Sequence, residues 1–295
     1  MVVKRNSLVQ KMQAAQLLSV VISTYNRSDA LLAVLDGLSR QTDQNFEVIV
    51  ADDGSAQAHS RQIIQSQVAK TLRVVHFWHP DIGFTLSSVR NRGVGLAQGD
   101  YLVFMDGDCV PEVDFIAQHK RLAQPGCFLN GSRVLLSADL TAGVLGGVQK
   151  LAGRSAGFWL KQRLLGHCNK LTGLLRLPNW RWRVRRQFSL KGIRGCNLAM
   201  WKADFLRVNG FDESFTGWGH EDADMVQRLH NAGVSRKNGY CATEVFHLWH
   251  KEAVRDKASQ NAAVVLERAK TGLTRSVRGY EQLRDAGDAV ITSLG

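Results

Sequence analysis

Apolar and polar positions follow two rhythms along the first hundred residues. The run Leu17–Ser23 is compact and apolar, and apolar residues then recur at helical spacing between Leu31 and Leu38, after the helix-starting pair Ser28 and Asp29. The same reading predicts strands at 46–51, 72–77 and 101–105, with helices at 57–68 and 86–97 between them. Strands separated by helices imply right-handed crossovers. The pattern therefore predicts an α/β fold with a mostly parallel, doubly wound sheet flanked by helices.

The rhythm stops between about 134 and 194 and then resumes. A strand is predicted at 197–201 and a helix at 222–230, which Asn231-Ala232-Gly233 would close as a C-cap. The stretch 258–283 has the composition of an amphipathic helix. We therefore expect a single domain with an irregular connecting segment in its middle and a helical tail.

Composition and charge narrow the class of protein. At 295 residues and 44% hydrophobic composition the chain can bury a large core. No stretch approaches eighteen uncharged residues, so no transmembrane helix is predicted, and the first apolar run is interpreted as a strand rather than a signal peptide. The five cysteines are scattered without a CxxC pair, which favours a reducing cytoplasm over a disulfide framework or a zinc site.

The net charge of +12 is concentrated in one segment. Thirteen Lys and Arg lie between Lys150 and Lys202, and no Asp or Glu lies between Thr141 and Ala203. This local excess favours an anionic partner. Three tryptophans interleave with the charges, Trp159, Trp180 and Trp182. We expect peripheral attachment to an anionic membrane surface, at the inner face of the cell membrane, and no nucleic-acid partner.

Paired acids follow two of the predicted strands. Asp52-Asp53-Gly54-Ser55 follows the second strand, and Asp106-Gly107-Asp108 follows the fourth. Ligands of open parallel sheets bind at the carboxyl ends of the strands. Carboxylates there can accept from a base or a ribose, and two of them one residue apart can face one hard cation.

Several motifs together resemble a known enzyme family. Ser23-Thr24-Tyr25-Asn26, Asp52-Asp53-Gly54-Ser55, Arg90-Asn91 with Gly99-Asp100-Tyr101, and Asp106-Gly107-Asp108 are similar in order and spacing to the inverting family-two glycosyltransferases of the GT-A fold. Gly217-Trp218-Gly219-His220-Glu221-Asp222 resembles the Gly-Trp-Gly-x-Glu-Asp motif of β-1,4-galactosyltransferases and of the bacterial chondroitin polymerase type. The resemblance covers about 17–130 and 192–251.

The resemblance implies a division of labour along the chain. Residues 17–130 would form the half that binds the nucleotide-sugar donor, 131–194 a basic connecting segment, 195–251 the acceptor and catalytic half, and 252–295 a helical tail. The acceptor would be a hydroxyl of a glycan or glycolipid used in cell-surface polysaccharide or lipopolysaccharide synthesis.

Roles on the donor side follow from the same resemblance. Asp53, with Asp52 beside it, would hold the base, and Ser23 and Tyr25 would flank it. Uracil is the first expectation, with guanine and thymine left open. Arg90 and Asn91 would assist substrate binding.

The resemblance also implies a metal site. Asp106 would meet the ribose and the metal, and Asp108 would bind Mn²⁺ or Mg²⁺. His247 and His250 lie where related enzymes place a metal-binding histidine, and the sequence leaves open which of them binds.

Asp222 is the expected general base, and its position has a separate rationale. Asp222, Met225 and Leu229 share one face of the predicted helix, so the carboxylate follows the buried stripe. Trp218 would stack on a sugar ring, and Glu221 would accept from acceptor hydroxyls. His220 stands where the family often has Gly.

Three other classes explain parts of the chain. An Asp-x-Asp phosphotransferase or phosphatase would use Asp106 as nucleophile, but that motif belongs after a first strand. A nucleic-acid-binding module would use Trp180, Trp182 and their arginines. A dinucleotide-dependent oxidoreductase would need a complete GxGxxG, and Gly93-Val94-Gly95 is incomplete.

Overall fold

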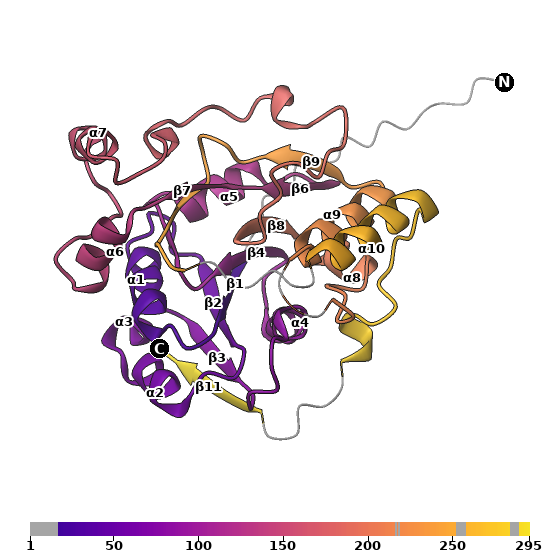
Figure 1. The fold of residues 1–295 in the computed structure, drawn as a ribbon, viewed down its shortest axis with the longest axis horizontal. Helices are drawn as coiled ribbons and strands as arrows, with labels where there is room; N and C mark the ends of the chain where they lie inside the picture. Colours follow the sequence, from indigo (N-terminus) through magenta and orange to yellow (C-terminus); the bar gives the residue numbers. More distant parts are fainter. Residues whose placement is uncertain (1–16, 216, 218, 252–257, 284–288) are drawn as a thin grey trace.

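The computed structural model describes residues 17–215, 217, 219–251, 258–283 and 289–295. A mixed sheet of eight strands forms its centre, in the order β11-β3-β2-β1-β4-β8-β6-β9 (Figure 1). Its strands are β1 Leu18–Thr24, β2 Phe46–Asp52, β3 Val74–Trp78, β4 Tyr101–Asp106, β6 Cys127–Asn130, β8 Asn197–Trp201, β9 Ser235–Asn238 and β11 Val290–Leu294. A second sheet has the order β5-β10-β7, with β5 Cys109–Pro111, β10 Glu244–His247 and β7 Ser132–Leu135.

Helices flank the sheet in the order in which the chain winds. They are α1 Ser28–Ser39, α2 Gln57–Gln65, α3 Gln67–Lys70, α4 Leu86–Leu96, α5 Phe115–Leu122, α6 Ala138–Leu145, α7 Ala156–Leu164, α8 Lys202–Arg207, α9 Glu221–Asn231 and α10 Ala258–Thr271, with short 3₁₀ turns at Thr172–Leu174, Arg181–Arg183 and Tyr280–Gln282. The helix predicted at 57–68 is two helices, because Ser66 ends α2 and caps α3.

The parallel part of the sheet is confined to its centre. β3, β2, β1 and β4 run parallel, whereas β8 runs antiparallel to β4, and β11 antiparallel to β3. The prediction of an α/β fold is confirmed, and strand pairing at both edges makes the sheet more mixed than the pattern indicated.

Two apolar cores fill the two faces of this sheet. Val20 and Ile22 of β1 pack with α1 in one core, and Val21 packs with Val89 and Val94 of α4 in the other. Successive side chains of a strand point to opposite faces, so a strand buried on both sides reads as one apolar run.

Gly93 and Gly95 lie inside α4, away from any strand-to-helix turn. A Cβ on Gly93 would come 2.8 Å from Cγ1 of Val21, so this glycine lets α4 pack closely on β1. The dinucleotide interpretation has no support from this geometry.

The C-terminal region differs from the predicted helix. α10 ends at Thr271, and Val290–Leu294 form β11 at the edge of the large sheet. α10 packs along α9, and Figure 1 shows the two helices side by side. Arg268 of α10 donates to Asp212 and Asp224, which ties the two helices together through buried charges.

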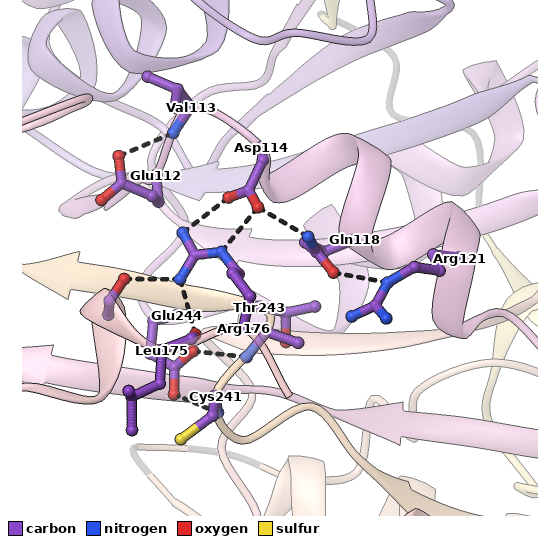
Figure 2. Close-up of polar contacts among 12 residues, drawn as sticks. Glu112, Val113, Asp114, Gln118, Arg121, Leu175, Arg176, Cys241, Thr243 and Glu244 are labelled. Atoms are coloured by element: carbon purple, nitrogen blue, oxygen red, sulfur yellow. Dashed lines mark hydrogen bonds and ion pairs between the residues drawn. The ribbon is translucent and has the colours of Figure 1, made fainter. Parts of the chain in front are cut away.

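The basic segment is folded against the domain rather than extended from it. Arg176 forms two hydrogen bonds to Asp114, of 2.6 and 2.7 Å (Figure 2). Arg183 is fully buried, and its guanidinium donates to the carbonyls of Leu177, Pro178, Asn238 and Tyr240. These two arginines therefore hold the segment in place.

The tryptophans of this segment divide in the same way. Trp159 is 1% exposed and stacks on Phe246 at a centroid distance of 4.2 Å. Trp180 and Trp182 are 58% and 49% exposed. The prediction that all three tryptophans and Arg183 face a membrane is therefore wrong for Trp159 and Arg183, which are used for packing.

Candidate active site

The carboxyl ends of β1, β2 and β4 meet at one edge of the sheet, beside a cavity of about 650 Å³. Its lining includes the predicted residues Ser23, Tyr25, Asp53, Asp106, Asp108, His247 and His250. Residues 23 and 106 are paired in the β-ladder, and the Ser23 hydroxyl lies 3.3 Å from Oδ1 of Asp106. Parallel strands bring these distant acids together because their ends share one edge.

Asp53 is held at one end of the cavity by the start of α4. Its carboxylate accepts from the backbone N–H and the hydroxyl of Thr85. Nε2 of His79 lies 3.3 Å from the same carboxylate, and this hydrogen bond raises the pKa of His79 despite burial. Tyr25 donates to Asp81 over 2.8 Å, so its ring is placed at the same end.

Asp52 lies beneath the cavity, with its side chain fully buried. Its carboxylate accepts from the backbone N–H of Ser55 and the hydroxyl of Ser60, and Nε2 of His76 lies 3.1 Å away. Burial alone would raise the pKa of Asp52, but these hydrogen bonds hold it below its ordinary value. Asp52 does not line the cavity, and it braces the loop that carries Asp53.

Asp108 and two histidines form the other end of the cavity. Oδ2 of Asp108 lies 3.1 Å from Nε2 of His250, and Oδ1 lies 3.8 Å from Nε2 of His247. β10 pairs with β5 so that His247 is opposite Cys109, and the N–H of Leu248 donates to the Asp108 carbonyl. The small sheet thus brings the late histidines to the early acid.

The histidines and the acids perturb one another. The hydrogen bond from Asp108 raises the pKa of His250 to about 9. Burial opposes the charge of Asp108, yet His250 and His247 hold its pKa below the ordinary value. Burial, with the charge of Asp108, raises the pKa of Asp106, although Arg90 offsets part of this effect.

Carboxylate and imidazole donors at this end suit a divalent cation. Ligand atoms of Asp108, Cys109 and His247 lie within 4.8 Å of one another. Burial raises the pKa of the Cys109 thiol well above its ordinary value, so a neutral thiol offers little to the cation. Oxygen donors favour Mg²⁺ or Mn²⁺, and imidazole nitrogen shifts the preference toward Mn²⁺. The residues present fit the predicted metal.

Arg90 connects the cavity to the start of α9. Nη2 of Arg90 lies 2.9 Å from Oδ1 of Asp106, and Nη1 lies 3.5 Å from Oε1 of Glu221. Burial, followed by repulsion from Asp222, raises the pKa of Glu221 to about 7. Glu221 and Asp222 do not line the cavity themselves, so Arg90 is the link between the two groups of acids.

Asn91 has a packing role next to Arg90. Its buried amide donates to the Phe211 carbonyl and accepts from the Phe211 N–H, both over 2.9 Å. The structure does not bring Asn91 to the cavity.

Asp222 sits in the first turn of α9. Oδ2 accepts from the backbone N–H of Gly195 over 2.8 Å, and Oδ1 accepts from that of Ala223 over 2.7 Å. A Cβ on Gly195 would lie 3.3 Å from both Asp222 and Arg90. His220, just before the helix, has a φ of 72°, a left-handed conformation. Trp218 lies outside the described residues.

Sequence reasoning missed four residues of this region. His79 and Thr85 hold Asp53, Gly195 contacts Asp222, and Arg133 of β7 lines the cavity. Thr85 before the predicted helix was the one local signal, because threonine is common at helix starts. The other three are recognisable only when distant strands are brought together.

Two family models match the parts of the chain that form this site. Residues 19–131 match glycosyl transferase family 2, and residues 180–251 match the N-terminal domain of galactosyltransferase. The chain belongs to the family 2 glycosyltransferases. The family resemblance that the motifs indicated is confirmed.

Curated relatives agree with this family. The chain is 32% identical over 233 residues to validoxylamine A glucosyltransferase of Streptomyces hygroscopicus subsp. jinggangensis, a match that covers 74% of this chain and 52% of that protein. It is 28% identical over 238 residues to chondroitin synthase of Escherichia coli, covering 73% of this chain and 32% of that protein. The chain therefore spans about half or less of the length of these relatives.

Solved structures of glycosyltransferases share the fold. A mannosyltransferase from Pyrobaculum calidifontis, in complex with GDP-Man and Mn²⁺, matches with a TM-score of 0.56 at 16% identity over 88% of this chain and 65% of that one. S. aureus TarS residues 1–349, in complex with UDP-GlcNAc, match with a TM-score of 0.56 at 15% identity over 90% and 69%. The fold is the GT-A fold, as predicted.

Proposed function

We propose that this chain is an inverting, metal-dependent glycosyltransferase that moves a sugar from a nucleoside-diphosphate sugar to a hydroxyl of a glycan or glycolipid. One observation carries the proposal. The acids that end β2 and β4, the histidines that follow β10 and the acids that begin α9 are joined around one cavity through Arg90. The names of the relatives, which are glucosyl-, mannosyl- and glycan-forming enzymes, support the same reaction class.

The donor occupies the cavity with its base at the Asp53 end. Asp53 accepts from the base, while Ser23 and Tyr25 line the space beside it. We favour uracil, and related folds are known with UDP-GlcNAc and with GDP-Man, so guanine is the alternative that the experiment must separate.

Asp106, Asp108, His247 and His250 hold the divalent cation at the other end. When bound, Mn²⁺ or Mg²⁺ supplies a Lewis acid that offsets the charge developing on the diphosphate. In this arrangement Asp52 and Asn91 act by positioning their neighbours rather than by touching the donor.

Asp222 is the general base of the transfer. Its carboxylate takes the proton of the acceptor hydroxyl, and that oxygen forms the new bond to the anomeric carbon while the bond to the diphosphate oxygen breaks. The two N–H donors on Asp222 fix the orientation of the carboxylate. Attack opposite the leaving group inverts the anomeric configuration, and no covalent enzyme intermediate is required.

The segments along the chain serve different parts of this reaction. Residues 17–130 form the donor half and 195–251 the acceptor half, and the basic segment 131–194 lies between them. In the C-terminal region 252–295, α10 supports α9, since Asn261 donates to the Gly219 carbonyl just before the catalytic helix.

The enzyme works at an anionic membrane surface on the cytoplasmic side, with a lipid-linked or lipopolysaccharide-type acceptor. Every helix in the described part of the chain is too short or too polar to cross a bilayer. Trp180 and Trp182 are exposed beside Arg181, Arg185 and Arg186. On α7, Leu160 and Leu164 are 50% and 88% exposed, so this face combines cations with apolar side chains suited to an interface.

A phosphatase built on Asp106 fits the geometry less well. Oδ1 of Asp106 is held by Arg90 and by Ser23, whereas a nucleophilic carboxylate needs a free oxygen and an acid–base partner beside it. The acids of α9 would have no part in such a reaction.

A thermal-shift panel tests the proposal. The chain is heated with UDP, GDP, dTDP or ADP, each with and without Mn²⁺, because a ligand of the native state raises the unfolding midpoint. We expect UDP with Mn²⁺ to give the largest rise. An absence of any rise with all four nucleotides, with and without the metal, would contradict the proposed function.

A further inference from the structure

Three cations without acidic partners lie on the acceptor side of the site. They are Arg133 on β7, Lys170 in the basic segment, and Arg194 just before Gly195. Within the described residues none of them forms an ion pair. Arg133 Nη1 reaches only the Cys196 sulfur, at 3.8 Å, Lys170 Nζ donates to the Ser132 hydroxyl, and Arg194 Nη1 donates to the Ile193 carbonyl.

The three charges are within electrostatic reach of one another. Burial lowers the pKa of Lys170, and the positive charges of Arg133 and Arg194 lower it further. Glu244 attracts Lys170, but its two oxygens accept from the backbone N–H groups of Cys241 and Ala242. Like charges held together without a partner repel, so an anion bound among them relieves an existing cost.

The position of the cluster distinguishes the acceptor side from the donor side. Arg133 lines the cavity next to Leu135 and Leu136, and its guanidinium turns toward Cys196. Arg194 and Cys196 flank Gly195, whose N–H binds Asp222. The cations therefore surround the segment that holds the base, whereas the base-binding end at Asp53 lies across the cavity.

We propose that Arg133, Lys170 and Arg194 bind an anionic group of the acceptor, a phosphate monoester or a carboxylate on the sugar next to the reacting hydroxyl. The proposal rests on the proposed function and names its acceptor class. Guanidinium and ammonium groups donate charge-assisted hydrogen bonds to such oxygens, and a guanidinium can do so with two donors at once. Lys170 keeps its place through the Tyr240 ring, 5.7 Å from Nζ.

Binding of small sugars tests the cluster. Methyl glucoside, glucose 6-phosphate and methyl glucuronide are titrated by calorimetry into the chain saturated with UDP and Mn²⁺, so that the donor phosphates are already in place. We expect at least one anionic sugar to bind about tenfold or more tightly than the neutral sugar, and the two anionic arms tell phosphate from carboxylate. Equal binding of all three sugars overturns the proposal.

Variants assign the effect to these residues. The double variant Arg133→Gln/Arg194→Gln should bind all three sugars alike, and Arg194→Gln alone, at an exposed position, should reduce the preference about threefold or more without risk to folding. Arg61→Gln on the exposed face of α2 makes the same charge change far from the site and should leave the preference intact.

Two further outcomes separate the ideas. If Arg133→Gln loses UDP affinity and keeps the full preference for anionic sugars, Arg133 serves the donor and the proposal is wrong. If UDP fails to bind the wild-type chain, the proposed function is contradicted. The cluster is then judged from the same titrations without UDP.

Discussion

Arg90 Nη2 lies 2.9 Å from Oδ1 of Asp106, although Arg90 is buried and Asp106 faces the cavity. The same guanidinium lies 3.5 Å from Oε1 of Glu221 at the start of α9. One side chain of α4 thus joins the acid that ends β4 to the acids that begin a helix more than a hundred residues later. In the proposed reaction these are the donor side and the proton-accepting side.

Arg90→Gln should lower the free energy of unfolding by about 2–3 kcal/mol. Removing one partner of a buried ion pair leaves the other charges uncompensated, and the cost stays below that of a fully buried pair because Asp106 is partly exposed. Chemical denaturation measures the change. Arg61→Gln, which removes an exposed charge, should change stability by less than about 0.5 kcal/mol. A loss for Arg90→Gln no larger than for this control would show that the link carries no stability.

The order of strands and helices in the donor half could be predicted because the signals are local. Strands β1, β2 and β4 are continuous apolar runs, since both of their faces are buried, and acids follow β2 and β4 directly. The family resemblance then followed from motifs that lie within a few residues of those strand ends.

The contacts across the site could not be predicted, because they depend on pairing between distant segments. His247 reaches Asp108 only through the ladder between β10 and β5, and both strands are too short to give a pattern. Arg183 and Trp159 looked like surface residues because charge and aromatic content do not say which side chains turn inward. The partners of Arg183 are backbone carbonyls, which the sequence does not mark.

Glu221 should make stability depend on pH. Its pKa is raised from 4.5 to about 7, so the folded state holds a proton that the unfolded chain has lost between these values. Stability should therefore fall as pH rises through this window. Glu221→Gln should flatten the slope and stabilise the chain at pH 8 by about 1–3 kcal/mol. Denaturation at pH 5 and pH 8 measures both effects, with Glu267→Gln on exposed α10 as the control. An unchanged slope in Glu221→Gln would show that this carboxyl is not perturbed.

Metal affinity should distinguish the residues around Asp108. Asp108→Ala should abolish Mn²⁺ binding in the presence of UDP, because it removes the oxygen ligand that both histidines face. His247→Ala and His250→Ala should each weaken it by about tenfold if both nitrogens serve. Calorimetric titration of Mn²⁺ measures this, and Asp139→Ala on exposed α6 is the matched control. Full Mn²⁺ affinity in Asp108→Ala would remove the metal from this end of the cavity.

Membrane attachment should depend on the exposed part of the basic segment. Replacing Arg181, Arg185 and Arg186 with Gln should weaken binding to anionic vesicles by about 3 kcal/mol at low salt, at about 1 kcal/mol per basic residue. Arg183 is left in place because it is buried. Co-sedimentation with anionic and neutral vesicles across a salt series is the measurement. Equal binding to both vesicle types would refute membrane attachment, and preference for a single-stranded nucleic-acid control would favour the nucleic-acid-binding class.

The base assignment of Asp222 is tested by a change that keeps its shape. Asparagine can still accept from the Gly195 N–H but cannot take a proton, so Asp222→Asn separates binding from chemistry. Calorimetry gives the affinity for UDP with Mn²⁺, and release of nucleoside diphosphate from the donor gives turnover to acceptor or water.

Turnover and donor affinity of Asp222→Asn, measured on the same preparation, test the central claim most directly. The account predicts UDP affinity within about twofold of wild type and turnover lower by roughly two to four orders of magnitude. Turnover within about threefold of wild type, with UDP affinity preserved, would contradict it.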